Sequence, residues 1–544
     1  MALQTKYKQT MTKHALLKLY QDIPYPSLAF AQTHPNQLAT IAILLGLEPP
    51  HVDNCRLLEL GCAIGGNIIP MACTIPDSQI IGIDFASNQI EIGRTTIEAL
   101  GLENITLKTM DILDITSDFG EFDYIIAHGI YSWTPSQVRD KVMAICKANL
   151  AQNGVAYISY NTYPGWHMLN ISRDLMLYHS RNDTEPLVRA KKARAALDFL
   201  IQSLPTDHKG YADFLKPYLN FLQHQLERVG DKKDTLLLHD EIAEFNNPVH
   251  FHQFVEHAAQ HGLQYLAEAN FSTIMPNKFP PHVQENLRHM ATDLIEMEQY
   301  MDYLLNRMFR QTLLCHAKSQ ITRVLNPARL VNLHFASRAK PVSDKPNIEI
   351  VSVERFQSVE GATLSTDHPV SKAAMSYLHQ ICPQTAHFRE LFNIARSMVP
   401  RSVWMEDPNL EAMVLGQTLL QGYTYGGNLV NLFMAPPKPT TKISQRPLAS
   451  RLARFQVTHS NEVTNLYHER VSLDEITRSV LSHLDGTQTK VQLLDKLIEW
   501  TTKGGLKISS HGEHISDCDT QQKILSMELD IQLQWLAKAA LLVG

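Results

Sequence analysis

A glycine-rich turn gives the strongest chemical signal in the chain. The run ELGCAIGGN (59–67) is an acidic strand end that opens into glycines and then into a helix. Glycines let the backbone approach a ligand closely, and the first turn of a helix presents unpaired N–H groups. The turn therefore predicts a nucleotide-like ligand. It does not identify that ligand, because Gly61-x-Ala63-x-x-Gly66 also approximates the fingerprint of dinucleotide-binding proteins.

Two further acids distinguish between these ligands. Asp84 ends the second expected strand, where its carboxylate can accept hydrogen bonds from ribose hydroxyls, and Asp111 closes the third, where it can accept from an adenine amino group. Together with Glu59 they place three acids at neighbouring strand ends. Such a group is unfavourable around a pyrophosphate but suits a ligand that carries an ammonium and a sulfonium. The sequence therefore predicts S-adenosylmethionine as the cofactor.

Aromatic side chains follow the fourth and fifth expected strands. The run SYNTYPGWH (159–167) surrounds a Pro-Gly turn, and HGIYSW (128–133) adds two more rings. Methyl transfer from a sulfonium is an in-line displacement that needs alignment, and a ring face stabilises a cation by about 0.5–2 kcal/mol. The alternative is that these rings only cover a domain interface. We expect the acceptor channel to be shaped by Tyr160, Trp166, Tyr131 and Trp133.

The elements that must position these residues alternate between β-branched runs and helical periodicity. This alternation is typical of a parallel sheet with crossover helices. Between the second and third strands we expect a helix capped by Ser87 and stopped by Gly101. The expected strands are 56–61, 79–85, 104–111, 122–129 and 154–162.

The sheet is expected to resume after a helical insert. Beyond Gly165 the apolar residues recur at helical spacing for some sixty residues. The run 251–271 then predicts a helix closed by Gly262 and a strand that starts near Leu263, and 308–317 predicts the last strand. The fold class is thus α/β, a Rossmann-like seven-stranded domain with a helical insert, followed by mixed α/β and winged-helix-like C-terminal domains.

Composition shifts divide the remaining chain. The proline-rich run APPKPTTKISQRP (435–447) predicts a linker, and two amphipathic helices around a DGTQT turn follow it. The expected domains are an N-terminal segment covering the cofactor site (1–45), the adenosylmethionine-binding core (46–167), the insert (168–238), the remainder of the sheet (239–317), a middle domain (318–434), the linker (435–447) and a winged-helix-like domain (448–544).

The chain resembles the class I methyltransferases over roughly residues 40–317. It departs from that family's pattern at Ala63, where glycine is common. QDIPYPSLAFAQTHP (21–35), SYNTYPGW, HDEIAEFNNPVHFHQFVEHAAQHGLQYLAEANF (239–271), FRQTLLCHA (309–317) and NLYHERVSLDEI (465–476) also resemble bacterial methyltransferases that carry a methyltransferase regulatory domain. The resemblance implies cofactor contacts from Glu59, Gly61, Cys62, Gly65, Asp84, Phe85, Asp111, Ile112 and His128, and from Tyr25 and His34 of the N-terminal segment.

That narrower resemblance also implies a substrate and a setting. Some members methylate lysines of outer-membrane proteins, work in the cytoplasm and form dimers. The expected function is therefore methylation of lysine side chains of a protein. Two alternatives stay open, a methyltransferase acting on a small metabolite or RNA, and a non-catalytic adenosylmethionine-binding regulator. The insert and the large C-terminal half offer a broad surface, which argues against a small substrate.

Composition excludes several other classes of protein. With 44% hydrophobic and 19% charged residues the chain is an ordinary globular protein, and a net charge of -6 gives no global field for DNA or an acidic membrane. The seven cysteines form no CxxC pair, which favours a reducing cytoplasm. We expect no signal peptide, membrane insertion or metal site, and the clustered histidines 250, 252, 257 and 261 are expected to lie on a surface helix. The C-terminal helix pair is expected not to bind DNA.

Overall fold

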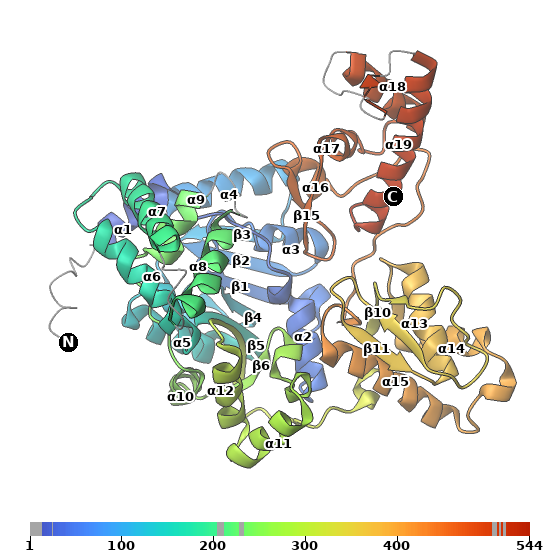
Figure 1. Ribbon diagram of the computed structural model, residues 1–544, viewed down its shortest axis with the longest axis horizontal. Helices are drawn as coiled ribbons and strands as arrows, with labels where there is room; N and C mark the ends of the chain where they lie inside the picture. The colour runs from blue at the N-terminus through green and yellow to red at the C-terminus, as the bar shows by residue number, and fades with distance from the viewer. Residues whose placement is uncertain are drawn as a thin grey trace.

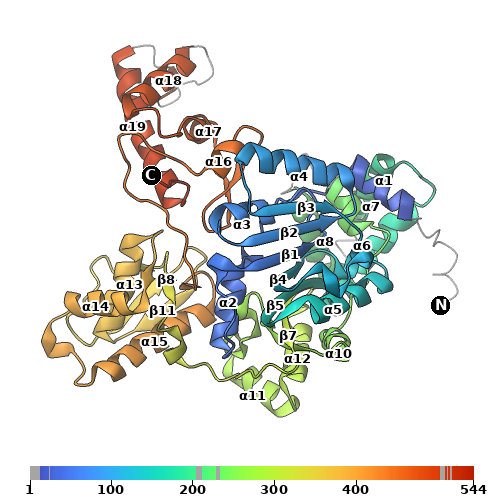
Figure 2. The same cartoon turned by 180° about the vertical axis from the view of Figure 1, so that it is seen from behind.

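The computed structural model describes residues 13–23, 25–203, 211–227, 233–502, 509–510, 513–514 and 518–544. Its centre is a seven-stranded sheet with the order β3-β2-β1-β4-β5-β7-β6 (Figures 1 and 2). The first five strands are parallel, and β7 is antiparallel to both β5 and β6. The strands are β1 (Arg56–Leu60), β2 (Gln79–Asp84), β3 (Ile105–Thr109), β4 (Phe122–Ala127), β5 (Leu150–Asn161), β6 (Leu263–Glu268) and β7 (Phe309–His316).

Strands β1 and β4 are buried almost throughout because helices cover both faces of the sheet. One apolar cluster lies on each face, and neighbouring residues of β5 point alternately into them. Tyr157 belongs to the first cluster, whereas Ile158 and Tyr160 belong to the second. The helices that flank the parallel strands are α2 (Pro35–Leu44), α3 (Ile68–Thr74), α4 (Ser87–Leu100) and α5 (Ser136–Asn149).

The ends of α4 partly follow the sequence prediction. Gly101 stops the helix at a left-handed φ of 58°. Ser87, however, is not the cap: it is the first helical residue, and Ala86 precedes it without a side-chain cap bond. The carboxylate of Asp84 accepts from the N–H of Ala86, so this acid holds the residue that precedes the helix but does not cap the helix itself.

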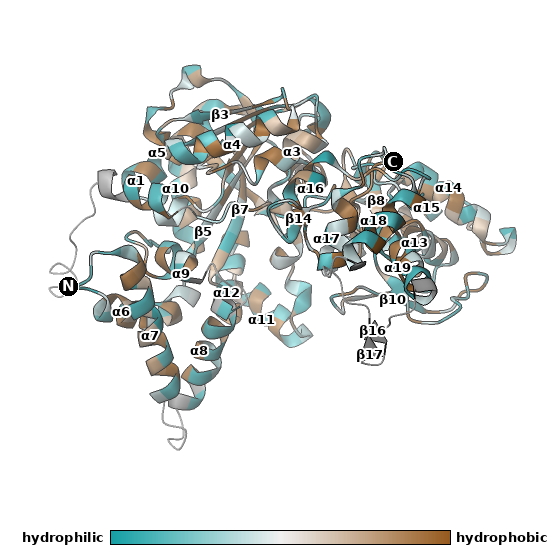
Figure 3. Cartoon of the chain, turned by 90° about the horizontal axis from the view of Figure 1, so that it is seen from above, coloured by the Kyte–Doolittle hydropathy of each residue, from teal (hydrophilic) through white to brown (hydrophobic). Residues whose placement is uncertain are grey.

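A helical segment separates β5 from β6, as predicted. Its helices α7 and α8 extend away from the sheet (Figure 3). Helix α10 then ends before Gly262, whose φ is 72°, and β6 begins at Leu263, which confirms the expected return to the sheet. The elements are α6 (Gly165–His179), α7 (Pro186–Ser203), α8 (Tyr211–Glu227), α9 (Lys233–Leu236), the π-helix η7 (Leu237–Glu241) and α10 (Phe251–Gln260).

Helices α11 (Pro281–Met290) and α12 (Leu294–Leu305) lie between β6 and β7. Beyond β7 the chain forms two small three-stranded sheets, β11-β10-β9 and β12-β8-β13. Their strands are β8 (His334–Ala336), β9 (Lys340–Pro341), β10 (Glu354–Gln357), β11 (Thr363–Thr366), β12 (Ala386–His387) and β13 (Asn431–Phe433), and the helices among them are α13 (Pro369–Ile381), α14 (Phe388–Met398) and α15 (Pro408–Tyr425).

The C-terminal part has its own apolar core. It is joined to the sheet region where Arg451 of α16 donates to the carbonyl of Ala99 in α4 at 3.0 Å. Within the described residues, no helix is long and apolar enough to cross a membrane. Its elements are α16 (Arg451–Gln456), β14 (Glu462–Thr464), β15 (Arg470–Ser472), α17 (Glu475–Ser482), α18 (Lys490–Thr502), β16 (Ser509–Ser510), β17 (Glu513–His514) and α19 (Cys518–Lys538).

Candidate active site

The glycine turn lies between β1 and α3, at the carboxyl edge of the parallel strands. Gly61 and Gly65 adopt φ of 74° and 78°, which only glycine adopts without strain. A Cβ on Gly61 would stand 2.2 Å from Cδ1 of Ile130. Ala63 also has a positive φ of 50°. The glycine that is common in the related family would be unstrained here, so Ala63 adds backbone strain to the turn.

Two acids border this turn. Glu59 is buried, and burial raises its pKa to about 8, against the hydrogen bond from Asn67 that lowers it. Its Oε1 accepts from Nδ2 of Asn67 at 2.7 Å, while its Oε2 has no hydrogen-bond partner among the described residues. Asp84 accepts from the N–H of Ala63 at 3.0 Å and from that of Ala86 at 2.9 Å. Burial also raises the pKa of Asp84.

These acids fit a cationic ligand. A buried carboxylate oxygen without a partner is costly, and an ammonium group at that position would satisfy both its hydrogen-bonding capacity and its charge. S-adenosylmethionine carries such an ammonium and supplies a methyl group on a sulfonium. Glu59 would therefore hold the amino-acid end of this cofactor, and Asp84, at the end of the neighbouring strand, its ribose.

The third acid, Asp111, follows β3 on the same edge of the sheet. Its Oδ1 accepts from the N–H of Leu113 at 2.9 Å and so begins a short helical turn at Ile112. Phe85, after β2, lies with its ring centroid 5.7 Å from that of Tyr20. The structure thus brings the expected ribose and adenine residues to adjacent strand ends and places a ring of the N-terminal segment beside them.

His128 follows β4. Its Nδ1 is 2.9 Å from the hydroxyl of Tyr157, and its ring centroid is 4.0 Å from that of Phe30. Burial lowers the pKa of His128 to about 4, so the imidazole is neutral. Phe309, at the start of β7, meets the same imidazole at 6.2 Å.

The N-terminal segment crosses the glycine turn. The hydroxyl of Ser27 accepts from the N–H of Gly66 at 2.8 Å, and the hydroxyl of Tyr25 donates to Asp240 of η7 at 3.4 Å. His34 is placed differently from the expectation. Its Nδ1 caps α2 by accepting from the N–H of Asn36, and its Nε2 faces Thr74 at 3.4 Å. Its polar contacts are therefore with helices α2 and α3 and not with the strand-end acids.

The four expected channel aromatics separate into two pairs. Trp133 and Trp166 meet edge to face at 6.1 Å, and Trp166 lines a cavity of about 210 Å³. Tyr131 and Tyr160 lie in the apolar core under α10, where Tyr160 stacks on Phe254 at 4.0 Å. Neither tyrosine lines the cavity.

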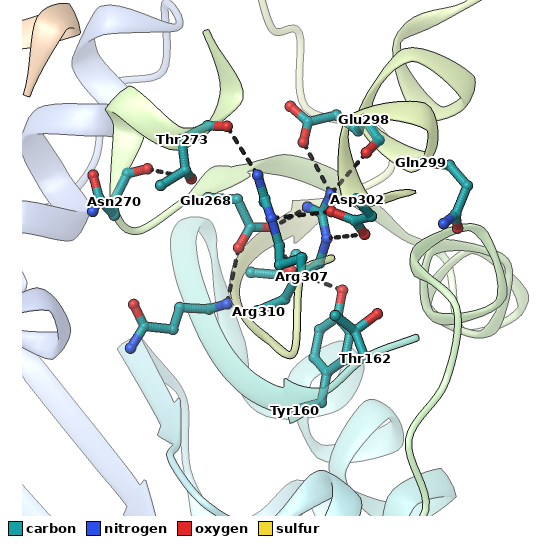
Figure 4. Close-up of polar contacts among 12 residues, drawn as sticks. Tyr160, Thr162, Glu268, Asn270, Thr273, Glu298, Gln299, Asp302, Arg307 and Arg310 are labelled. Carbon is teal, nitrogen blue, oxygen red and sulfur yellow. Dashed lines mark hydrogen bonds and ion pairs between the residues drawn. The ribbon is translucent and has the colours of Figure 1, made fainter. Parts of the chain in front are cut away.

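The placement of Tyr160 has a physical reason. Tyr160 lies between Ser159 and Asn161 on β5, so its side chain points to the face of the sheet opposite to theirs. Its hydroxyl meets that of Thr312 at 3.0 Å, beside a buried ion-pair network (Figure 4). Tyr131 likewise pairs with His257 of α10 at 2.8 Å. Both tyrosines therefore lie in the core under α10, and their expected role in the acceptor channel stays a prediction.

The channel cavity has one charged group that the sequence reasoning missed. Its walls come from Asn161 of β5, from Trp166 and Leu169 of α6, and from Met308 and Phe309 at the start of β7, and Glu241 of η7 also lines it. Its Oε2 is buried without a partner among the described residues, and burial raises the pKa of Glu241. The acidic residues of HDEIAEFNNP are visible in the sequence. No local pattern, however, predicts a π-helix there or the direction in which its acidic side chains point.

A larger cavity of about 490 Å³ lies elsewhere. Its lining comes from the N-terminal segment, the residues that follow β6, one residue of β7 and the C-terminal half, and includes Gln37, Arg338, Tyr423 and Glu469. It contains none of the strand-end acids or the four channel aromatics. The volume of a cavity therefore does not identify the cofactor site in this molecule. The strand-end acids and the glycine turn identify it.

Three family models match the chain. They are described as a methyltransferase domain (residues 51–192), a predicted methyltransferase regulatory domain (233–316) and the PKMT C-terminal winged helix domain (445–541). An uncharacterized protein of Rickettsia prowazekii (strain Madrid E) is 34% identical over 534 residues, which cover 96% of this chain and 93% of that protein. A second protein of that organism is 37% identical over 247 residues, 45% of this chain and 96% of its own length.

A solved structure has the same fold over nearly the whole chain. PKMT2 from Rickettsia typhi in complex with AdoHcy superposes with a TM-score of 0.83 at 28% identity, over 96% of this chain and all of that one. The match includes the sheet, the insert and the C-terminal part. The expected α/β fold class is thereby confirmed, as is the expected winged-helix domain at the C-terminus. The chain belongs to the family of S-adenosylmethionine-dependent methyltransferases that join a class I methyltransferase domain to a methyltransferase regulatory domain and a PKMT C-terminal winged helix domain.

Proposed function

We propose that this methyltransferase transfers the methyl group to lysine side chains of a protein. The observation that carries the proposal is the cavity beside Trp166, whose walls are almost entirely apolar and whose lining includes one acidic residue, Glu241. A lysine side chain has the matching chemistry, four methylenes that end in an ammonium group. The chain matches the PKMT C-terminal winged helix domain and has the same fold as PKMT2 from Rickettsia typhi. Both matches support the same substrate class.

The cavity lies near the carboxyl ends of β4 and β5. Asn161 ends β5, and Phe309 contacts His128, which follows β4. In the sheet β4 lies between β5 and β1, and Glu59 and the glycine turn lie at the end of β1. An acceptor that enters between Trp166 and Phe309 therefore reaches the cofactor edge from the side opposite to the ribose acids.

Glu241 would solve the protonation problem of this reaction. A free lysine has a pKa of about 10.4, so its ammonium must lose a proton before nitrogen can attack. The carboxylate of Glu241 would take that proton, and bound S-adenosylmethionine would supply the methyl group and leave as S-adenosylhomocysteine. The neutral amine would thereby become a methylated ammonium. Its raised pKa makes Glu241 a stronger base than an exposed glutamate.

The experiment combines product identification with a matched pair of variants. Outer-membrane protein from a Gram-negative bacterium is incubated with the enzyme and labelled S-adenosylmethionine, and mass spectrometry locates the methyl groups. Glu241→Gln should lower kcat by about a hundredfold near neutral pH without changing AdoHcy affinity. The control Glu256→Gln, exposed on α10, should leave kcat unchanged. The deficit of Glu241→Gln should shrink as rising pH deprotonates the acceptor.

The outcomes separate the hypotheses. Methyl groups on RNA or on a small metabolite, with none on lysine, would overturn the proposal and favour the first alternative. Cofactor binding without any transfer would favour a regulator. Methyl-lysine formed equally well by Glu241→Gln would keep the substrate class and remove Glu241 from its role.

We further propose that the protein is a bacterial cytoplasmic enzyme that methylates outer-membrane proteins before their export. We also propose that it works as a homodimer. Exposed apolar side chains on the projecting helices support the dimer, among them Leu187, Val188 and Phe199 of α7 and Phe221 of α8. Sedimentation equilibrium of the wild type and of Phe199→Lys tests it. A monomeric wild type at micromolar concentration would exclude the dimer.

A further inference from the structure

The C-terminal domain reaches the cofactor turn through a short loop. Residues 465–469 connect β14 to β15, and Asn465 shapes them by accepting from the N–H groups of Tyr467 and Glu469, both at 2.9 Å. At the tip, His468 is 1% exposed and has a left-handed φ of 62°. The backbone of a histidine in this conformation is strained. Such strain persists only where the surrounding contacts hold the residue in place.

The partner of His468 lies 401 residues earlier in the chain. Its Nε2 is 2.9 Å from Oδ1 of Asn67, the residue that precedes α3 at the end of the glycine turn. Asn67 in turn donates from Nδ2 to Oε1 of Glu59 at 2.7 Å and to the hydroxyl of Thr33 at 3.0 Å. A continuous chain of hydrogen bonds therefore joins the winged-helix domain to the acid that faces the cofactor.

The direction of these hydrogen bonds is determined. The backbone N–H of Phe30 donates to Oδ1 of Asn67 at 3.0 Å, so the amide oxygen must face both Phe30 and His468. His468 can then only donate, which requires a proton on Nε2. Its Nδ1 has no partner among the described residues. Burial, together with the neighbouring His34, lowers the pKa of His468 well below 6.5 and keeps the ring neutral.

We propose that His468 is a positioning residue of the cofactor site. By donating to Asn67 it fixes the amide that holds Glu59, so that Oε2 of Glu59 is presented to the amino group of S-adenosylmethionine. Without this donor the amide of Asn67 loses one of its fixed partners and Glu59 loses its alignment. Docking of the winged-helix domain and cofactor affinity are then coupled, and the coupling is reciprocal.

The test uses three variants of the full-length chain, with AdoHcy binding measured by titration calorimetry. His468→Gln keeps a donor near the position of Nε2 and should bind within about threefold of wild type. His468→Ala and His468→Asn remove the donor and should bind about tenfold more weakly. Asparagine is the matched control, because it tolerates the left-handed backbone better than glutamine but is too short to reach Asn67.

A second background identifies the route. In Asn67→Ala protein the further change His468→Ala should have no additional effect on AdoHcy affinity, because the residue through which it acts is gone. Hydrogen exchange supplies a readout that does not depend on the variants: AdoHcy should slow exchange of the amides at 465–469. The proposal is overturned if His468→Asn binds as well as His468→Gln, or if His468→Ala weakens binding equally in both backgrounds.

Discussion

Two regions of this molecule bury several carboxylates, and they treat the charge in opposite ways. Under β6, β7 and α12, the fully buried Arg310 bonds to Glu268, Glu298 and Asp302 at 2.8 to 3.0 Å (Figure 4). Arg307 adds a second cation to Asp302 at 3.0 Å. At the cofactor edge, Glu59 and Asp84 receive only neutral N–H donors, and no lysine or arginine among the described residues forms an ion pair with them.

The difference indicates what each region is for. Buried charges need a partner, and a protein that supplies its own cation gains a fixed structural junction. Here that junction ties the strands of the regulatory region to the helix that covers them. At the cofactor edge no lysine or arginine among the described residues pairs with Glu59 and Asp84. We infer that a bound ligand supplies the positive charge there.

Removal of the internal cation should have the largest effect. Arg310→Met leaves Arg307 as the one cation beside three buried carboxylates and should lower the free energy of unfolding by about 3–5 kcal/mol, measured by urea denaturation. Arg288→Met on the exposed face of α11 is the control. Burial already raises the pKa of Glu298 to about 7, so the folded variant binds extra protons and its deficit should shrink at acidic pH. An undiminished stability would break the contrast.

Removal of an acid at the cofactor edge should lower cofactor affinity strongly and the free energy of unfolding only slightly. Asp84→Ala should weaken AdoHcy binding by about ten- to a hundredfold, because hydrogen bonds to a charged group are lost. Its free energy of unfolding should change far less than that of Arg310→Met. Calorimetry and denaturation of the same sample measure both. Wild-type affinity in this variant would remove Asp84 from the site.

The pKa of Glu59 sharpens the comparison further. Because it is raised to about 8, ligand-free protein at lower pH holds this group protonated, whereas pairing with an ammonium requires the carboxylate. AdoHcy affinity should therefore rise about tenfold between about pH 6.5 and 8.5, and binding near neutral pH should release a proton. Calorimetry in buffers of different ionisation enthalpy measures the proton directly. Glu59→Gln should abolish that release.

The smallest effect is expected at Ala63. Its left-handed φ of 50° is strained for any residue with a Cβ, so Ala63→Gly should raise the free energy of unfolding by up to about 1 kcal/mol. Cofactor affinity should not fall. Ala99→Gly, in the exposed face of α4, should do the reverse and destabilise by about 1 kcal/mol. A loss of stability in Ala63→Gly would show that the methyl group has a packing role.

The sequence by itself determined the sheet and the acids at its edge. Strands such as β1 and β4 show as apolar runs, glycines at 101 and 262 end helices by their backbone conformation, and Glu59, Asp84 and Asp111 follow directly from where their strands stop. These are local signals, and parallel strands bring their carboxyl ends together whatever the rest of the chain does.

Only the tertiary structure decided which side chains meet across the fold. Tyr160 and Trp166 are close in sequence, yet the alternation of β5 sends one into the core and α6 places the other at the cavity. Glu241 gains its position from a π-helix, and His468 reaches Asn67 from 401 residues away. Local periodicity carries no information about such contacts, because they arise from the packing of elements that are distant in the chain.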